Sequence, residues 1–293
     1  MRYLDRVHPV CAFVYFVSVI AVTMITMHPV VVSLCFLMGV SLYGVLCGGR
    51  RLLKSLGWSV PMMLLVALLN PILSHKGSTV LLFLNDTPIT LESTVYGAVF
   101  ALMIAAVFYW FGCYSEIMTS DKFIYLFGRL IPKLSLLLSM TLAAIPRLKR
   151  QYREIDDAQR TVTPDADGSV TAKLRRGTSV FSALVSRALE GSIETADSMR
   201  ARGYGLRGRT AYSIFRFTAA DAATLTITLL LAATTLTLLV VGSADYSYYP
   251  TLGRIGLSLK DLALYAAPTL LCTGAILMEV KETVSWHILR SSI

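Results

Sequence analysis

Six apolar stretches of 17 to 23 residues, almost free of charged side chains, constrain the fold of this chain more than any other feature. Such lengths match the roughly 20 residues that an α-helix needs to cross a bilayer. Charged residues make up only 15% of the chain, against about 25% in soluble domains. The sequence therefore predicts an all-α, polytopic membrane protein of about six transmembrane helices. The predicted spans are residues 10–27, 30–46, 56–73, 93–111, 219–241 and 259–278.

The charges outside these spans are unequally divided between the two sides of the predicted membrane. Six spans place both termini on one side, together with the long polar segment 116–216. The only basic residues on the opposite side are Lys76 and Arg254, together with Lys260 at the entrance of the last span. Because loops rich in Lys and Arg stay in the cytoplasm, we expect a multi-pass protein of the cell membrane with both termini cytoplasmic. The basic residues on the terminal side outside 116–216 are Arg2, Arg6, Arg50, Arg51, Lys54, Lys281 and Arg290.

The spans and the polar segment divide the chain into three regions. Residues 1–115 form an N-terminal bundle of four spans, and residues 217–293 form a C-terminal transmembrane pair. Within the first region, 78–91 has two apolar runs around Asn85-Asp86-Thr87-Pro88, a pattern typical of a short hairpin, here on the extracellular side. The loop after the fifth span contains three tyrosines that indicate an interfacial aromatic belt: Tyr246, Tyr248 and Tyr249.

Segment 116–216 is too polar to cross a membrane and carries most of the excess charge. It holds 17 of the 27 Lys and Arg residues and 10 of the 18 Asp and Glu residues, a net charge of +7. A basic helical surface suits anionic membrane lipid or an acidic groove on another protein. It does not suit nucleic acid, because the basic residues are not interleaved with stacking aromatic side chains. Helical periodicity predicts cytoplasmic helices at 121–130, 134–142 (bounded by Pro132 and Pro146), 147–160 and 178–204, with a turn-rich break at 161–171.

The predicted helix 178–204 has a defined start, end and face. Thr178 or Ser179 can cap its start, and Gly203 stops it. Arg200 and Arg202 lie in its last turn, where the helix dipole favours cations. Small residues along the helix form a seam on which another helix, that of 134–160, can pack closely. The residues of the seam are Ala188, Gly191, Ser192, Thr195 and Ala196.

Several classes of function lack the residues that they need. The five cysteines form no CxxC pair and no His/Cys cluster has metal-ligand spacing, so we expect no catalytic residues, no metal and no cofactor. No Walker A stretch occurs, so a P-loop does not hold ATP. No predicted span has a charge near its middle, which disfavours the main alternative, a self-sufficient permease or secondary transporter. Asp221 is expected to pair with Arg216 at the interface, and His75 to be a structural loop residue.

Several motifs together resemble those of one family. The last of them is the strongest match. The chain resembles, over almost its whole length, the transmembrane T component of energy-coupling factor (ECF) transporters, the cobalt-transport Q-component family. The motifs that carry the resemblance are residues 70–77 (NPILSHKG), 88–92 (PITLE), Tyr96-Gly97, 120–123 (SDKF), 130–132 (LIP), 145–151 (IPRLKRQ), and 188–190 (ALE) with 195–205 (TADSMRARGYG).

The resemblance implies a non-catalytic subunit of an ATP-driven importer. Such a T component binds two ABC-type ATPase subunits through long cytoplasmic coupling helices, and it holds a small membrane protein that captures a vitamin or a metal ion. Family members dock each ATPase through a short motif with a central Arg. Ala201-Arg202-Gly203, preceded by Arg200, matches the second motif.

The first motif departs from the family pattern. It should end the helix 147–160, where the family has Ala-Arg-Gly after Ala-Gln-X. This chain reads Ala158-Gln159-Arg160-Thr161-Val162-Thr163, so Val162 stands in place of the expected Arg. Either Arg160, beside Gln159, substitutes from two positions upstream, or the first ATPase contact is weakened.

Overall fold

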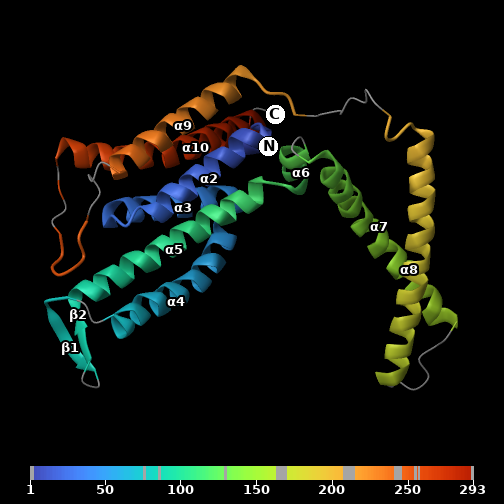
Figure 1. Ribbon diagram of the computed structural model, residues 1–293, viewed down its shortest axis with the longest axis horizontal. Helices are drawn as coiled ribbons and strands as arrows, with labels where there is room; N and C mark the ends of the chain where they lie inside the picture. Colours follow the sequence, from blue (N-terminus) through green and yellow to red (C-terminus); the bar gives the residue numbers. More distant parts are fainter. Residues whose placement is uncertain are drawn as a thin grey trace. The chain divides into compact units, whose positions relative to one another are not determined.

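The chain folds into two compact units, Met1–Lys122 with Phe215–Ile293, and Phe123–Ile214. The computed structural model describes residues 3–74, 77–84, 87–128, 131–162, 170–206, 215–240, 246–253, 256 and 258–291. Within these residues there are ten helices and one two-stranded hairpin (Figure 1). The residues discussed above that lie outside the described residues include Arg2, His75, Lys76, Asn85, Asp86, Leu130, Thr163 and Arg254.

The first unit is a bundle of apolar helices. The predicted span nearest the N-terminus forms α2 (Pro9–Ile25), an apolar helix of only 17 residues that follows the short α1 (Tyr3–Arg6). Over the residues that the structure describes, the protein is all-helical apart from the hairpin, as predicted, and five helices, against about six predicted, are long and apolar enough to cross a membrane. These five are α3 (Pro29–Cys47), α4 (Gly49–Leu73), α5 (Leu91–Ile117), α9 (Ala219–Val240) and α10 (Leu259–Ser291).

Local sequence explains where the first helices begin and end. Pro9 and Pro29 stand at the start of α2 and α3, where the missing N–H costs nothing because no helical carbonyl would accept it. His8 and His28 are the corresponding N-cap residues. Gly48 separates α3 from α4 with a φ of +82°, a conformation that favours glycine. A continuous apolar sequence is thus divided into separate helices.

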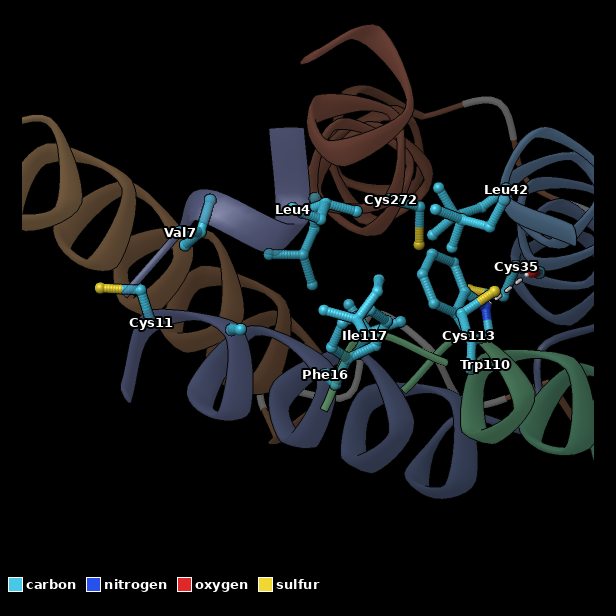
Figure 2. Packing of buried hydrophobic residues seen from close by; sticks show 14 of the residues in the cluster. Leu4, Val7, Cys11, Phe16, Cys35, Leu42, Trp110, Cys113, Ile117 and Cys272 are labelled. Atoms are coloured by element: carbon cyan, nitrogen blue, oxygen red, sulfur yellow. Dashed lines mark hydrogen bonds between the residues drawn. The ribbon is translucent and has the colours of Figure 1, made fainter. Parts of the chain in front are cut away.

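The core of the bundle lies around α5, which packs against α2, α3 and α4. Trp110 of α5 is fully buried, and its Nε1 donates a 3.0 Å hydrogen bond to the carbonyl of Cys35 in α3 (Figure 2). Gly39 lets the indole ring lie this close, because a Cβ at that position would be 3.0 Å from Nε1. Cys113 and Cys272 are buried in the same cluster, so these cysteines serve as packing residues.

The expected hairpin is present between α4 and α5. Strands β1 (Val80–Leu84) and β2 (Thr87–Thr90) pair antiparallel. The carboxylate of Glu92, in the first turn of α5, accepts hydrogen bonds from the N–H of Thr79 at 3.2 Å and from its hydroxyl. Gly77 has a φ of +141°, and a Cβ there would lie 2.6 Å from Oε2 of Glu92. The chain before the hairpin is therefore fastened to the start of α5.

The second unit contains α7 (Pro132–Val162) and α8 (Val170–Ala201), which cross each other (Figure 1). They follow α6 (Ser120–Gly128), close to the helix predicted at 121–130. The break expected at Pro146 is wrong, since α7 continues through it. One interior proline removes a backbone hydrogen bond and costs about 3 kcal/mol, which the rest of a long helix can offset.

The expected start of the last coupling helix is also wrong. α8 begins at Val170, two turns before the predicted cap at Thr178, and Gly177 lies inside it. The additional turns bring Arg176 against α7. This tertiary contact is not visible in local sequence preferences, which favoured a cap at the Thr-Ser pair.

Tyr248 has a different place from the interfacial belt that was expected. Its side chain is 6% exposed, and its hydroxyl donates a 2.6 Å hydrogen bond to the carbonyl of Met27. Its ring lies 5.2 Å from that of Tyr96 in α5. Tyr248 is therefore a packing residue of the bundle, because the free carbonyl after α2 offers its hydroxyl a partner.

Candidate functional site

The end of α8 has a backbone hydrogen-bond pattern that fixes the geometry of its tip. The N–H of Tyr204 donates to the carbonyl of Met199 at 2.9 Å, and the N–H of Gly203 donates to the carbonyl of Arg200 at 2.9 Å. Gly203 has a φ of +73°. These features together define a Schellman motif with glycine at the left-handed position. The predicted stop at Gly203 is therefore present.

Arg202 is the C-cap residue of this motif. Its N–H donates to the carbonyl of Ser198 at 3.1 Å, while its side chain is exposed. Arg200 and Ala201 are exposed as well. The tip thus presents two guanidinium groups beside the negative end of the helix dipole, which favours cations. A guanidinium offers a planar fork of donors that suits a carboxylate or backbone carbonyls on another molecule.

Polar side chains join the end of α7 to the first half of α8. Oδ1 of Asp156 lies 3.4 Å from Nε of Arg176, and these side chains are only 15% and 19% exposed. Nε2 of Gln159 donates a 2.8 Å hydrogen bond to Oγ of Ser179. The next residue, Val180, is 1% exposed. These contacts mark the place where the two helices cross.

Arg160, the candidate residue of the first motif, is held by its own helix. Its Nη2 lies 2.9 Å from Oδ2 of Asp156, to which its Nε also donates at 3.1 Å. Thr161 donates from its hydroxyl to the carbonyl of Ala158 at 2.7 Å, and Val162 is the last residue of α7. The two candidate tips therefore differ in sequence, because α8 ends in a glycine cap whereas α7 is followed by Thr163 and Pro164.

α7 does not cover the centre of the small-residue seam of α8. A Cβ added at Gly191 would meet no atom within 4 Å, so the close contact expected there is absent within the described chain. The reason is that α7 crosses α8 beside Val180. The hydroxyls of Ser192 and Thr195 donate back to the carbonyls of Ala188 and Gly191, at 2.7 and 2.6 Å. Ala196 is exposed.

The same helix exposes a row of large apolar side chains. Phe181, Leu189 and Ile193 are 66%, 63% and 64% exposed. Their spacing in multiples of four places them on one face of the helix. Contiguous exposed apolar surface of this kind marks an interaction site.

The first unit has a buried polar junction at α1. The N–H of Leu4 donates to Oε2 of Glu279 in α10 at 3.1 Å, and its carbonyl accepts from Nζ of Lys122 in α6 at 3.2 Å. Glu279 and Lys122 are 1% and 4% exposed. Burial lowers the pKa of Lys122, and the charge of Asp5 partly opposes that shift. The junction ties the N-terminus to the helix that leads into the second unit.

Asp221 has neutral partners instead of the expected Arg216. Its Oδ2 accepts hydrogen bonds from the N–H and the hydroxyl of Thr218 at 3.0 and 2.6 Å. Its Oδ1 accepts from the N–H of His8 at 3.1 Å. The expected ion pair is therefore wrong for the part of the chain that the structure describes, since Asp221 satisfies backbone donors beside the start of α9.

Sequence reasoning named Gln159 and Arg160 as candidate ATPase-docking residues but did not indicate their partners near the helix crossing. The spacing of Asp156 and Arg160 by four residues is a signal that could have identified the first partner. Arg176 and Ser179 are partners only because of the way α8 crosses α7, which spacing along one helix does not reveal. Within the described ranges, no group of three or more His, Cys, Asp or Glu side chains could hold a metal ion.

Comparison with known proteins adds one finding to this geometry. No curated protein matches the chain. A family model described as CbiQ, cobalt transport protein, matches residues 5–212. That match covers more than two thirds of the chain, from α1 through the tip of α8. The chain therefore belongs to the CbiQ family of cobalt transport proteins, the T components of ECF transporters.

Proposed function

We propose that this chain is the coupling subunit of an ATP-driven importer. It links two ABC-type ATPase subunits to a small membrane protein that captures a vitamin or a metal ion. Its family supports the coarser statement, a membrane component of a cobalt or ECF transport system. The chain hydrolyses no ATP in this proposal, because the ATPase subunits supply the energy. Residues 116–216 act as the coupling module, and 1–115 and 217–293 form the membrane part.

The observation that supports this proposal best is the exposed guanidinium of Arg202 on a capped helix end. Its backbone is fixed by hydrogen bonds at Ser198, Arg200 and Met199, so the side chain extends from a defined point. A cation of this kind can enter a groove on an ATPase and pair with acidic or carbonyl groups there. Ala201 and Gly203 carry almost no side chain, so they do not cover the Arg202 guanidinium, and Arg200 adds a second positive charge two residues away.

A second contact belongs to the end of α7. Arg160 and Gln159 are its proposed residues, in place of the Arg that the family pattern puts at Val162. Gln159 contacts α8 directly, and Arg160 shares the carboxylate of Asp156 with Arg176 of α8, so docking there would act on the crossing. Closure of the two ATPases around ATP would then change the angle between α7 and α8.

The exposed apolar row of α8 is the proposed surface for the small substrate-binding membrane protein. Phe181, Leu189 and Ile193 would be covered by an apolar face of that protein, which removes their large exposed area from water.

Basic residues in 116–216 support a cytoplasmic position for this module, and for both termini, by the positive-inside rule. Anionic lipid at that surface would attract the same residues.

The test is co-purification of the tagged chain with its partners, followed by identification of the retained subunits. Arg202→Glu should leave the chain in the membrane and remove ATPase subunits, because truncating one partner of a buried charge pair costs about 2–5 kcal/mol. Arg187→Glu is the matched control, since it makes the same charge change at an exposed position of the same helix.

A second pair of variants separates the two kinds of partner. Leu189→Ser with Ile193→Ser should release the small membrane protein and keep the ATPases. Arg202→Glu should do the reverse. Retention of both ATPases by Arg202→Glu at the wild-type level would refute the proposed docking role.

A further inference from the structure

A groove runs between α4 and α5 in the first unit. It has a volume of about 180 Å³, and its walls are almost wholly apolar. Trp58, Met62 and Val66 line it from α4, and Ala101 and Phe108 line it from α5. The small alanine side chains of α5 form the bottom of the groove, and the larger side chains of α4 form one of its sides. Trp58 is 81% exposed, so the groove is open to the surroundings of the bundle.

Ser59, the buried polar side chain of the groove, has its hydroxyl paired. The hydroxyl of Ser59 shares a 2.8 Å hydrogen bond with that of Tyr109 across the two helices. Ser59 also contacts the carbonyl of Leu56 at 3.3 Å. No unpaired donor or acceptor is therefore described at the bottom of the groove, and a saturated chain would lie there without burying an unsatisfied polar group.

The end of the groove nearest the start of α4 is basic. Arg51 and Lys54 precede Ser55 and Trp58 at four-residue steps, so they continue the row of residues that lines the groove. Nη1 of Arg51 lies 3.8 Å from Oε1 of Glu116 at the end of α5, and this pair bridges the two walls. Lys54 and the neighbouring Arg50 are exposed. The mouth therefore carries an excess of two positive charges over the carboxylate of Glu116.

From this arrangement we propose that the α4/α5 groove binds one anionic phospholipid. One acyl chain lies between Trp58 and Ala101, and the phosphate lies at Lys54 and Arg50. The basic cluster and the apolar groove lie about one helical turn apart on α4. They match the charged headgroup and the apolar acyl chain of such a lipid. The charge of the mouth selects an anionic headgroup over a neutral one.

The size of the groove favours an acyl chain over a helix of another subunit. Its volume of about 180 Å³ is slightly above the roughly 150 Å³ apolar cavity that admits one benzene molecule. A helix with side chains is about 10 Å across and would need a much wider opening. A segment of a hydrocarbon chain is narrow enough to lie in a groove of this volume.

The experiment measures which lipids the full-length protein retains. The protein is purified from vesicles containing equal amounts of phosphatidylglycerol and phosphatidylcholine with identical acyl chains, and bound lipid is counted by native mass spectrometry. The wild type should retain phosphatidylglycerol in preference to phosphatidylcholine. The double variant Arg50→Gln, Lys54→Gln should lower that preference about tenfold. The control Arg147→Gln, Arg150→Gln removes the same charge from exposed positions of α7 and should keep it.

Two further measurements test the groove itself. Ala105→Leu places a larger side chain at the bottom of the groove and should reduce retention of either lipid. If Ala105→Leu fails to fold, the double variant Arg50→Gln, Lys54→Gln still tests the proposal, because both of its positions are exposed. A photoreactive benzoylphenylalanine at Met62 should form an adduct with the mass of a phospholipid. The proposal would be overturned if the wild type retained the two lipids equally, or if the α7 control lost the lipid preference as much as the Arg50 and Lys54 variant. A protein adduct at Met62 would also overturn it.

Discussion

Asp156 and Arg176 join α7 to α8 across 3.4 Å, between Oδ1 of the carboxylate and Nε of the guanidinium. The other oxygen of the same carboxylate accepts a hydrogen bond from Arg160 at 3.1 Å. One carboxylate therefore connects the crossing of the two helices to the candidate docking residue at the end of α7. Because the side chains of Asp156 and Arg176 are mostly buried, this contact is stronger than an exposed surface pair.

Asp156→Asn should loosen the helix crossing without changing its shape. The substitution removes the charge from hydrogen bonds that contribute about 1.5–3 kcal/mol when one partner is ionised. Amide hydrogen exchange around Val180 should then become about ten- to a hundredfold faster. Asp157→Asn, at the exposed neighbouring position, is the control and should have little effect. Equal protection in both variants would show that the Asp156 contact does not hold the crossing.

Arg160→Ala should impair ATPase binding less than Arg202→Ala. Arg160 is paired within its own helix to Asp156, whereas Arg202 has no ion pair among the described residues. Affinities of the two single variants for the purified ATPases provide the measurement. Equal losses would mean that the contact of Arg160 is as strong as that of Arg202, despite the pair of Arg160 with Asp156.

Gly191→Leu should uncouple ATP hydrolysis from uptake without unfolding the chain. Space around Gly191 is open in this chain, and leucine raises helix stability by up to about 0.8 kcal/mol relative to glycine. In the assembled transporter the new side chain would overpack the seam, which typically costs about 1–3 kcal/mol. Uptake per ATP hydrolysed is measured in the reconstituted complex.

Gly177→Leu is the matched control for this substitution. Gly177 lies in the same helix, also with open space around it, but outside the seam. Both variants should gain similar helix stability. Normal uptake per ATP in Gly191→Leu would mean that the seam faces water or lipid in the complex.

Gly77→Ala should destabilise the region before the hairpin. Its φ of +141° is strained for alanine, and the added Cβ would lie 2.6 Å from Oε2 of Glu92. The expected loss is about 1–3 kcal/mol, seen as a lower thermal unfolding temperature. Gly57→Ala in α4, where a Cβ meets no neighbour, should be neutral or slightly stabilising. A similar unfolding temperature for both variants would contradict the role assigned to Glu92.

Mild acid should destabilise the protein through His28. This residue is 5% exposed between Tyr246 and Tyr265, and its Nδ1 has no hydrogen-bond partner among the described residues. Burial lowers the pKa of His28 from its ordinary value of 6.5, and the charge of Asp261 partly opposes that shift. Since the unfolded chain then binds the proton more readily, stability is full above pH 6.5 and falls as the pH drops below it.

The measurement for His28 is the unfolding temperature near pH 7.5 and near pH 5.5. His28→Phe should reduce the difference between the two temperatures. A smaller difference should remain, because burial also lowers the pKa of His8. An unchanged difference in His28→Phe would show that its titration is not linked to folding.

The membrane helices could be predicted from sequence because a bilayer requires long apolar runs. Their ends were less predictable, since Arg50 and Arg51 belong to α4 although they lie outside its apolar stretch. The start of α8 was missed for a related reason. Arg176 holds the first turns through a contact with a residue of another helix, and no local preference indicates that contact.

The tip of α8 was predicted well because a helix end of this type depends on few residues. Gly203 and the two arginines before it are enough to indicate a glycine cap with cations in the last turn. The crossing at Val180 was not predicted, because its position depends on which faces of two amphipathic helices meet. The packing of Tyr248 was not predicted for the same physical reason, since its hydroxyl partner at Met27 is distant in sequence.

The position of Val180 gives α8 the mechanics of a lever. Val180 is the only buried side chain that α7 and α8 have among their described residues, so it acts as the fulcrum. The arm from Val180 to Arg202 is about 33 Å long at 1.5 Å per residue, and the arm back to Val170 is about 15 Å. A tilt of about 10° would therefore move the arginine tip by about 6 Å and the opposite end by less than half as much. Side chains at the fulcrum would move little, so a subunit that pulls on Arg202 would gain mechanical advantage without breaking the contact between Asp156 and Arg176.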